Sequence, residues 1–116
     1  MGASYSKRKT QVSIAGGEKL VCVIALGYGA TQGRPHKNRP MDALCQPEGD
    51  MPDWFRKGME AAMLAPTAIN QQKFLFSLKD TAVSAKALPG PFSKVDLGIV
   101  KYHFEAGAGK DNFIWA

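Results

Sequence analysis

The chain contains little of what builds the more constrained classes of protein. Only two cysteines, Cys22 and Cys45, occur among its 116 residues, too few for the disulfide framework of a small secreted domain. The longest apolar run, LVCVIALGYGA, has roughly half the length of a membrane span, and no signal peptide precedes it. His36 and His103 have no acidic pattern around them, so we expect no metal site. These absences favour a soluble protein of the reducing cytoplasm.

Positive charge exceeds negative charge along the chain. Fifteen Lys and Arg stand against ten acidic residues, for a net charge of +5, and the excess lies at residues 7–9 and 34–39. Such a domain can bind nucleic acid, anionic lipid or a phosphorylated small molecule. Because the sequence has no RNA-reading aromatic motif, zinc-finger spacing or convincing helix-turn-helix, we expect no nucleic-acid partner.

The first nine residues, MGASYSKRK, fit two incompatible interpretations. Gly2 and Ser6, followed by the basic residues 7–9, match the pattern for an N-myristoyl group beside a basic patch, which would make a membrane-surface protein. Alternatively, Met1 is an interior residue of a longer protein. The N-myristoylation motif is short and frequently matched by chance, and one acyl chain gives only marginal membrane binding. We therefore favour the second interpretation and expect no membrane partner.

The length is that of one domain, which we expect to cover residues 1–116. Residues 1–19 are an irregular lead-in. Residues 30–51 form a long basic loop, whose three prolines and two glycines argue against a long regular element. Between them, the apolar run at 20–26 is rich in Val and Ile and predicts a strand covered on both faces, with Cys22 as a small buried hydrophobe.

Regular elements are clearer in the second half of the chain. The segment from about 52 to 64 predicts a helix, because proline suits the first turn and apolar residues recur on one face; Pro66 ends it. KFLFSL then places Phe74, Phe76 and Leu78 on one side of a strand, and AVSAKAL is its predicted hairpin partner.

A second helix is predicted over SKVDLGIVKYHFEAG. Ser93 and Asp96 match a capping box, and Gly107 stands where a C-terminal cap is expected. Apolar residues go nearly all the way round this segment, which predicts a central helix. Two helices with three or four short strands predict an α+β fold.

The polar turn APTAINQQKF, residues 65–74, is the most informative stretch. A helix ends against a proline, Thr67, Asn70 and Gln71 follow, and a strand begins at once. Such a turn can present amides to a ligand while its two ends are held rigidly. An ordinary helix-to-strand connection has the same pattern, and local physics leaves both readings open.

This turn resembles the segment of flavin-dependent nitroreductases that reads Ala-Pro-Ser-x-x-Asn-x-Gln-Pro-Trp. VIALGYG followed by RPHKNRP is similar to the family's late strand and Gly-Tyr-Pro loop with its basic pair, and residues 93–116 resemble the closing segment of the compact branch. The resemblance implies the C-terminal half of the nitroreductase fold, with a mostly antiparallel sheet packed against two main helices. It also implies a truncated domain, so that a homodimer partner or the missing N-terminal half would complete the site.

The implied activity is that of an FMN-dependent oxidoreductase, which passes electrons from NAD(P)H to a nitroaromatic or quinone-like small molecule. The turn would lie against the flavin ring and ribityl chain, and the basic loop would hold the FMN phosphate, which needs fixed cations at its oxygens. The implied cofactor-binding residues are Lys37, Arg39, Pro66, Thr67, Ala68, Asn70 and Gln71. Because QQKF replaces the commoner Gln-Pro-Trp ending, Gln72, Lys73 and Phe74 are assigned no ring contacts by analogy.

Two other functions stay open on the sequence: a noncatalytic flavin-fold or partner-binding module, and the lipidated protein described above. No catalytic acid or nucleophile is evident, and a flavin enzyme needs none, because the cofactor carries the chemistry. The family's early Arg-x-Ser-x-Arg/Lys segment is missing. We therefore expect the chain alone to bind FMN weakly or not at all.

Overall fold

The computed structural model describes residues 12–24 and 26–116. The chain divides into two parts, Gly2–Pro35 and His36–Ala116. The N-myristoylation pattern at Gly2 and the basic residues 7–9 lie outside the described residues.

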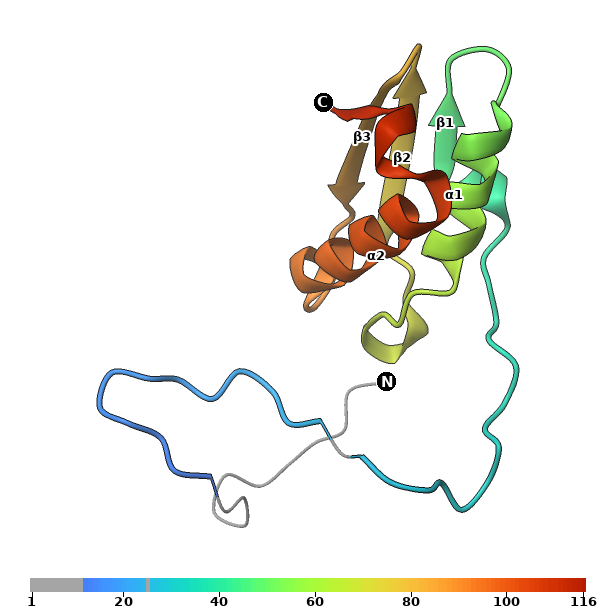
Figure 1. Ribbon diagram of the computed structural model, residues 1–116. Coiled ribbons are helices and arrows are strands. Elements are labelled where there is room, and N and C mark those ends of the chain that lie inside the picture. Colours follow the sequence, from blue (N-terminus) through green and yellow to red (C-terminus); the bar gives the residue numbers. More distant parts are fainter. Residues whose placement is uncertain (1–11, 25) are drawn as a thin grey trace. The chain divides into compact units, whose positions relative to one another are not determined.

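The part His36–Ala116 is a four-stranded sheet with two α-helices over one of its faces (Figure 1). The helices are α1 (Asp53–Met63) and α2 (Ser93–Ala108), the strands are β1 (Cys45–Pro47), β2 (Phe74–Lys79), β3 (Ala82–Ala87) and β4 (Ile114–Trp115), and short 3-10 turns are η1 (Met41–Ala43), η2 (Ala68–Asn70) and η3 (Lys110–Asn112). This arrangement confirms the predicted α+β class.

The sheet is mixed, with strand order β1-β2-β3-β4. β2 and β3 form an antiparallel hairpin from Phe74 opposite Ala87 to Lys79 opposite Ala82, as predicted. β1 pairs parallel to β2, and β4 parallel to β3. The two parallel pairs arise because α1 connects β1 to β2 and α2 connects β3 to β4, and a helical crossover returns the chain in the same direction. The predicted mostly antiparallel sheet is therefore only partly matched.

The core lies between the hairpin and the helices. Phe74, Phe76 and Leu78 of β2 are buried, as the alternation predicts. The ring of Phe76 stacks on Phe104 of α2 with centroids 4.8 Å apart, and Phe55 of α1 meets Phe104 edge to face at 5.4 Å. Each such pair contributes about 0.5–1.5 kcal/mol beyond its buried area. These contacts fix the two helices on the sheet, and so fix both ends of the turn between α1 and β2.

α1 confirms the predicted helix, whereas α2 differs from its prediction in three respects. No side-chain hydrogen bond caps its N-terminus, and Asp96 of the predicted capping box bonds to the distant turn instead. The C-terminal cap is Gly109, whose φ is +77°, and Gly107 lies inside the helix. The helix is also not central: Val95 and Tyr102 are 63% and 71% exposed, because the sheet and α1 cover only one side of it.

The predicted buried strand at 20–26 is wrong. The described residues of this segment form no strand, and Val21, Ile24 and Leu26 are 80–95% exposed. Cys22, expected to be buried, is exposed as well. An apolar β-branched sequence does not suffice for a strand, since its backbone groups need a paired neighbour and its side chains need cover.

Glu105 on α2 fastens the C-terminal end of the chain to the helix. Its carboxylate accepts a hydrogen bond of 2.8 Å from the indole N–H of Trp115 and pairs with Lys110 Nζ at 3.1 Å. The pKa of Glu105 is lowered, mainly by the hydrogen bond from Trp115 and next by Lys110. The ionised form of this side chain therefore stabilises the fold.

This stabilisation should depend on pH. Because the pKa of Glu105 is lower in the folded state, its contribution is present above the usual glutamate pKa of about 4.3 and is lost as the pH falls through the folded value. Glu105→Gln keeps an oxygen for Trp115 but has no charge. We expect the wild type to melt at a higher temperature than this variant near neutral pH, and the difference to shrink at about pH 3. A difference that does not change between the two pH values would contradict a role for the charge.

Candidate functional site

The basic loop and the polar turn meet in the structure. Residues 37–39 lie in the predicted long loop, whose later residues form η1 and β1, and the turn at 67–72 connects α1 to β2. Hydrogen bonds join these segments across 33 to 35 positions of sequence. We call this contact the loop–turn junction, comprising residues 37–39 and 67–72.

Two side-chain amides of the turn hold the basic loop by its backbone. Asn70 Nδ2 donates to the carbonyl oxygen of Lys37 at 2.9 Å, and Gln72 Nε2 donates to the same oxygen at 2.7 Å. Gln72 Oε1 accepts from the backbone N–H of Arg39 at 2.8 Å. Lys37 and Arg39 are exposed, and in the described part of the chain neither takes part in an ion pair. The backbone is thus fixed while both cations are presented to solvent.

The turn has a strained backbone. Ile69, Asn70 and Gln72 have φ values of +48°, +55° and +47°, in the left-handed region that costs a non-glycine residue about 1–2 kcal/mol. The buried Thr67 helps to hold this conformation, because its Oγ1 accepts from the Gln72 backbone N–H at 3.1 Å. Strain of this kind persists only where the surroundings over-determine it, and it clusters at ligand-binding sites.

Asp96 of α2 supports the turn from the other side. Its carboxyl group, in a residue only 5% exposed, accepts from the Ala68 backbone N–H at 3.0 Å and from Gln71 Nε2 at 2.7 Å. Gln71 Nε2 also donates to the Pro91 carbonyl at 2.7 Å. Gln71 Oε1 is buried and, among the described residues, has no hydrogen-bond partner. The side-chain amide of Gln71 therefore joins the turn to the start of α2.

All seven residues predicted to bind the cofactor lie in the junction or next to it. The carbonyl oxygen of Lys37 accepts from Asn70, and Arg39 contacts Gln72. Thr67 and Ala68 already use a polar group in contacts within the protein, and Pro66 is exposed beside them. Their contact with a cofactor stays a prediction. The residues of this set are Lys37, Arg39, Pro66, Thr67, Ala68, Asn70 and Gln71.

Gln72 is the residue that sequence reasoning left without a role. It is 2% exposed, and its side chain makes the bonds that connect both segments. The Asn-x-Gln spacing of the family places the glutamine two residues after Asn70, and so at Gln72 and not at Gln71. Strict counting along the motif could have found it.

The chemistry of the junction fits one end of an FMN molecule. A phosphate dianion needs cations at its oxygens, and the turn holds the backbone of two cationic residues. The Arg39 guanidinium can donate paired hydrogen bonds, and the Lys37 ammonium is a point charge. Pro66 and Ile69 add exposed apolar surface on the turn, with Ile69 81% exposed. A flat ring system can lie against such a surface.

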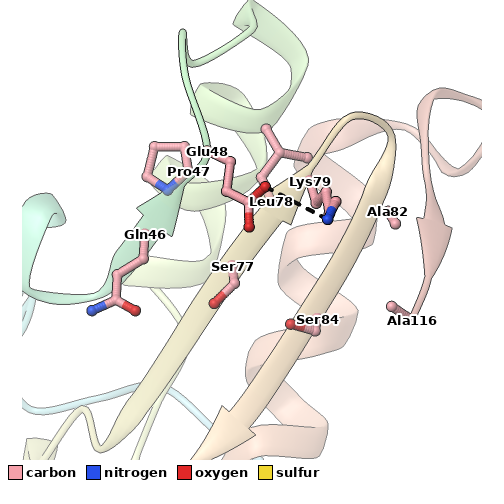
Figure 2. Close-up of a pocket in the computed structure, with 9 residues that line it drawn as sticks. All are labelled: Gln46, Pro47, Glu48, Ser77, Leu78, Lys79, Ala82, Ser84 and Ala116. Carbon is pink, nitrogen blue, oxygen red and sulfur yellow. Dashed lines mark ion pairs between the residues drawn. The ribbon is translucent and has the colours of Figure 1, made fainter.

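A shallow pocket lies on the face of the sheet that α1 and α2 do not cover, and it lacks the features of the junction. Its volume is about 450 Å³, and Figure 2 shows Gln46, Ser77 and Ser84 presented to it from three strands. The ion pair between Glu48 and Lys79, 4.0 Å long, crosses one side. No histidine and none of the predicted site residues line it, so we do not place the functional site there.

Two further classes of site are not found in the described chain. Within residues 12–24 and 26–116, no group of three or more His, Cys, Asp or Glu side chains could hold a metal ion. No helix in the same residues is both long and apolar enough to cross a membrane.

Comparison with known proteins identifies the family. Residues 1–108 match a family model described as "Putative TM nitroreductase". No curated protein and no solved structure gives a significant match. The matched range includes both segments of the loop–turn junction and ends with the last residue of α2. Because it spans nearly the whole chain, the protein belongs to this nitroreductase family of oxidoreductases.

Proposed function

We propose that the chain carries the phosphate end of an FMN site in a nitroreductase-type oxidoreductase, which passes electrons from NAD(P)H to a nitroaromatic or quinone-like acceptor. The observation that carries this proposal is the junction, in which the strained turn at 67–72 holds the backbone of two exposed cationic residues. The family match supports the class of reaction. The cytoplasm is the compartment we propose, because it supplies NAD(P)H and keeps free thiols such as Cys22 and Cys45 reduced.

In this proposal, Lys37 and Arg39 bind the FMN phosphate. Their backbone is already held by Asn70 and Gln72, so little loop entropy is lost when the phosphate binds. The turn at 66–71 lies against the ribityl chain and the ring. Its rigid support from Asp96 keeps that surface in one conformation.

The bound flavin would supply hydride acceptance from the nicotinamide and electron transfer to the acceptor. The chain would orient the flavin through the turn that Asp96 holds, and Lys37 and Arg39 would supply positive charge. The exposed surface at Pro66 and Ile69 leaves room for a flat ligand, and donor and acceptor would use the same open face in turn. We therefore expect ping-pong kinetics.

Removing either cation should weaken FMN binding. Purified wild type, Lys37→Ala and Arg39→Ala are titrated with FMN up to millimolar concentration while flavin fluorescence is followed, since weak binding is expected. Each substitution removes a charge-assisted contact and should raise the dissociation constant about tenfold. Lys86→Ala is the matched control, because Lys86 is an exposed cation on β3 and belongs to neither segment of the junction. The FMN affinity of this variant should equal that of the wild type.

Because the turn already holds the basic loop, we expect weak and not absent FMN binding by the chain alone. Two results would contradict the proposal: no FMN binding by the wild type, or equal affinity in all four proteins. Turnover is measured separately, as NADH or NADPH oxidation with excess FMN and a quinone acceptor. Binding that depends on Lys37 and Arg39 without any turnover would instead support a noncatalytic flavin-binding module.

A further inference from the structure

Gln72 has every side-chain polar atom occupied. Its Oε1 accepts from the Arg39 N–H at 2.8 Å, and its Nε2 donates to the Lys37 carbonyl at 2.7 Å and to Asn70 Oδ1 at 2.9 Å. The residue is 2% exposed, so these bonds are shielded from water. A buried amide whose partners all lie in one junction holds them at a fixed spacing.

The basic loop depends on these bonds for its position. Residues 31–40 are exposed throughout, and regular structure begins only at η1. Of the bonds from the turn to the backbone of 37–39, Asn70 supplies one and Gln72 supplies two. Arg39 Nη1 adds a longer contact of 3.4 Å to the Gln72 carbonyl. Without the Gln72 amide, the loop would keep one side-chain tether and would sample many conformations.

We propose that Gln72 is a positioning residue that makes this site select phosphate-bearing flavins over riboflavin. The inference rests on the proposed function, because it takes Lys37 and Arg39 as the phosphate ligands. Gln72 acts on the phosphate through the backbone of these two residues. Electrostatic recognition requires charges fixed at the anion's oxygens, so the spacing of the pair determines how much the phosphate adds to the affinity.

Gln72 and Asp96 both hold the turn, but their removal should change flavin affinity in different ways. The two shortest Gln72 side-chain bonds lead to the basic loop, and the others stay within the turn at Asn70. The Asp96 bonds lead instead to Ala68 and Gln71, which lie in the part of the turn proposed to contact the flavin ring. Loss of the Gln72 amide should therefore weaken FMN binding while riboflavin, which has no phosphate, binds almost unchanged. A purely structural role would weaken both flavins alike. The ratio of the two affinities thus separates positioning from general stability.

The experiment compares wild type, Gln72→Met and Gln46→Met in the full chain. Methionine has nearly the volume of glutamine but makes none of its hydrogen bonds. Gln46 is exposed on β1 and serves as the control. Each protein is titrated with FMN and with riboflavin. We expect Gln72→Met to lose about tenfold in FMN affinity and less than about twofold in riboflavin affinity, and Gln46→Met to retain the wild-type ratio.

The bonds from the Gln72 side chain to the backbone of Lys37 and Arg39 are called here the Gln72 clamp. Hydrogen exchange tests whether this clamp forms, without flavin and without a variant. The Arg39 amide donates to the buried Gln72 Oε1, whereas within the described chain the amides of Lys37 and Asn38 have no acceptor. Exchange at Arg39 should be at least about tenfold slower than at those two neighbours. If Gln72→Met does not fold, this measurement on the wild type still decides whether the clamp forms.

Several outcomes would overturn the inference. If Gln72→Met loses affinity equally for FMN and riboflavin, the residue has a structural role only. If neither affinity changes, Gln72 does not position the phosphate ligands. Unprotected exchange at Arg39 would show that the clamp is absent. No flavin binding by the wild type would overturn the proposed function and this inference together, whereas FMN selectivity that needs Lys37 and Arg39 but not Gln72 would overturn the inference alone.

Discussion

Replacing Gly107 with alanine is expected to lower the free energy of unfolding by about 3 kcal/mol. A Cβ at this position would lie 2.5 Å from the carbonyl oxygen of Lys57 and 2.6 Å from the Ala61 Cβ, because α1 and α2 cross closely here. The nearest atom belongs to the backbone, so no side-chain rotation can relieve the clash. The helices would have to separate, which would loosen the aromatic core beneath them.

Gly98 on the same helix gives a matched control. A Cβ there would meet no atom within 4 Å, and alanine is favoured over glycine in a helix interior by about 0.5–1 kcal/mol. Gly98→Ala should therefore raise the free energy of unfolding, while Gly107→Ala lowers it. Urea unfolding of the wild type and both variants measures the two changes. Opposite signs are expected; a shared sign and size would show that Gly107 does not set the distance between the helices.

The contrast between these glycines shows what local sequence can predict. The hairpin of β2 and β3 and the extent of α1 follow from alternation, periodicity and Pro66, all of which act over a few residues. Gly107 fitted a helix cap equally well on local grounds. Its actual position inside α2 depends on the approach of α1, a contact with residues about fifty positions earlier.

The run at 20–26 failed for a related reason. Its composition correctly indicates that the segment suits a strand, but a strand exists only where another strand pairs with it. The described residues of this run have no such pairing. Propensity states what a segment could join, whereas pairing and burial decide whether it does.

The candidate site divides in the same way. The residue types of the junction, two cations and several amides, were visible in the sequence, and their resemblance to nitroreductase segments implied phosphate and flavin. Three features were not visible: the positive φ values at Ile69, Asn70 and Gln72, the clamp between Gln72 and the basic loop, and the reach of Asp96 to the turn. Each depends on contacts between distant segments, and Asp96 had an obvious local explanation as a helix cap.

Asp96→Ala should have the largest effect of any single change at the turn. The substitution removes the acceptor of the Ala68 N–H and one of two acceptors of Gln71 Nε2. Leaving buried donors unsatisfied costs about 1–3 kcal/mol each, so we expect the free energy of unfolding to fall by about 3 kcal/mol. The turn itself would shift, so FMN and riboflavin binding should both weaken by at least about tenfold, unlike the selective loss expected for Gln72→Met.

Asp111→Ala is the control for removal of an acidic side chain, because Asp111 is exposed in η3. Its stability should stay within about 0.5 kcal/mol of the wild type. Urea unfolding and the two flavin titrations are run on all variants in parallel. A wild-type-like Asp96→Ala protein would mean that the turn is held without α2.

Asp96→Asn tests whether the effect comes from the acceptor geometry. Asparagine retains one oxygen, which can still accept from the Ala68 N–H, but its amide group then faces Gln71 Nε2, donor against donor. Gln71 cannot resolve this by rotating its amide, since its oxygen would then face the Pro91 carbonyl, to which Nε2 now donates. We therefore expect Asp96→Asn to lie between wild type and Asp96→Ala in stability and in affinity for both flavins. An asparagine variant as weak as the alanine variant would assign the support of the turn to the Gln71 bond, and one equal to wild type would assign it to the Ala68 bond.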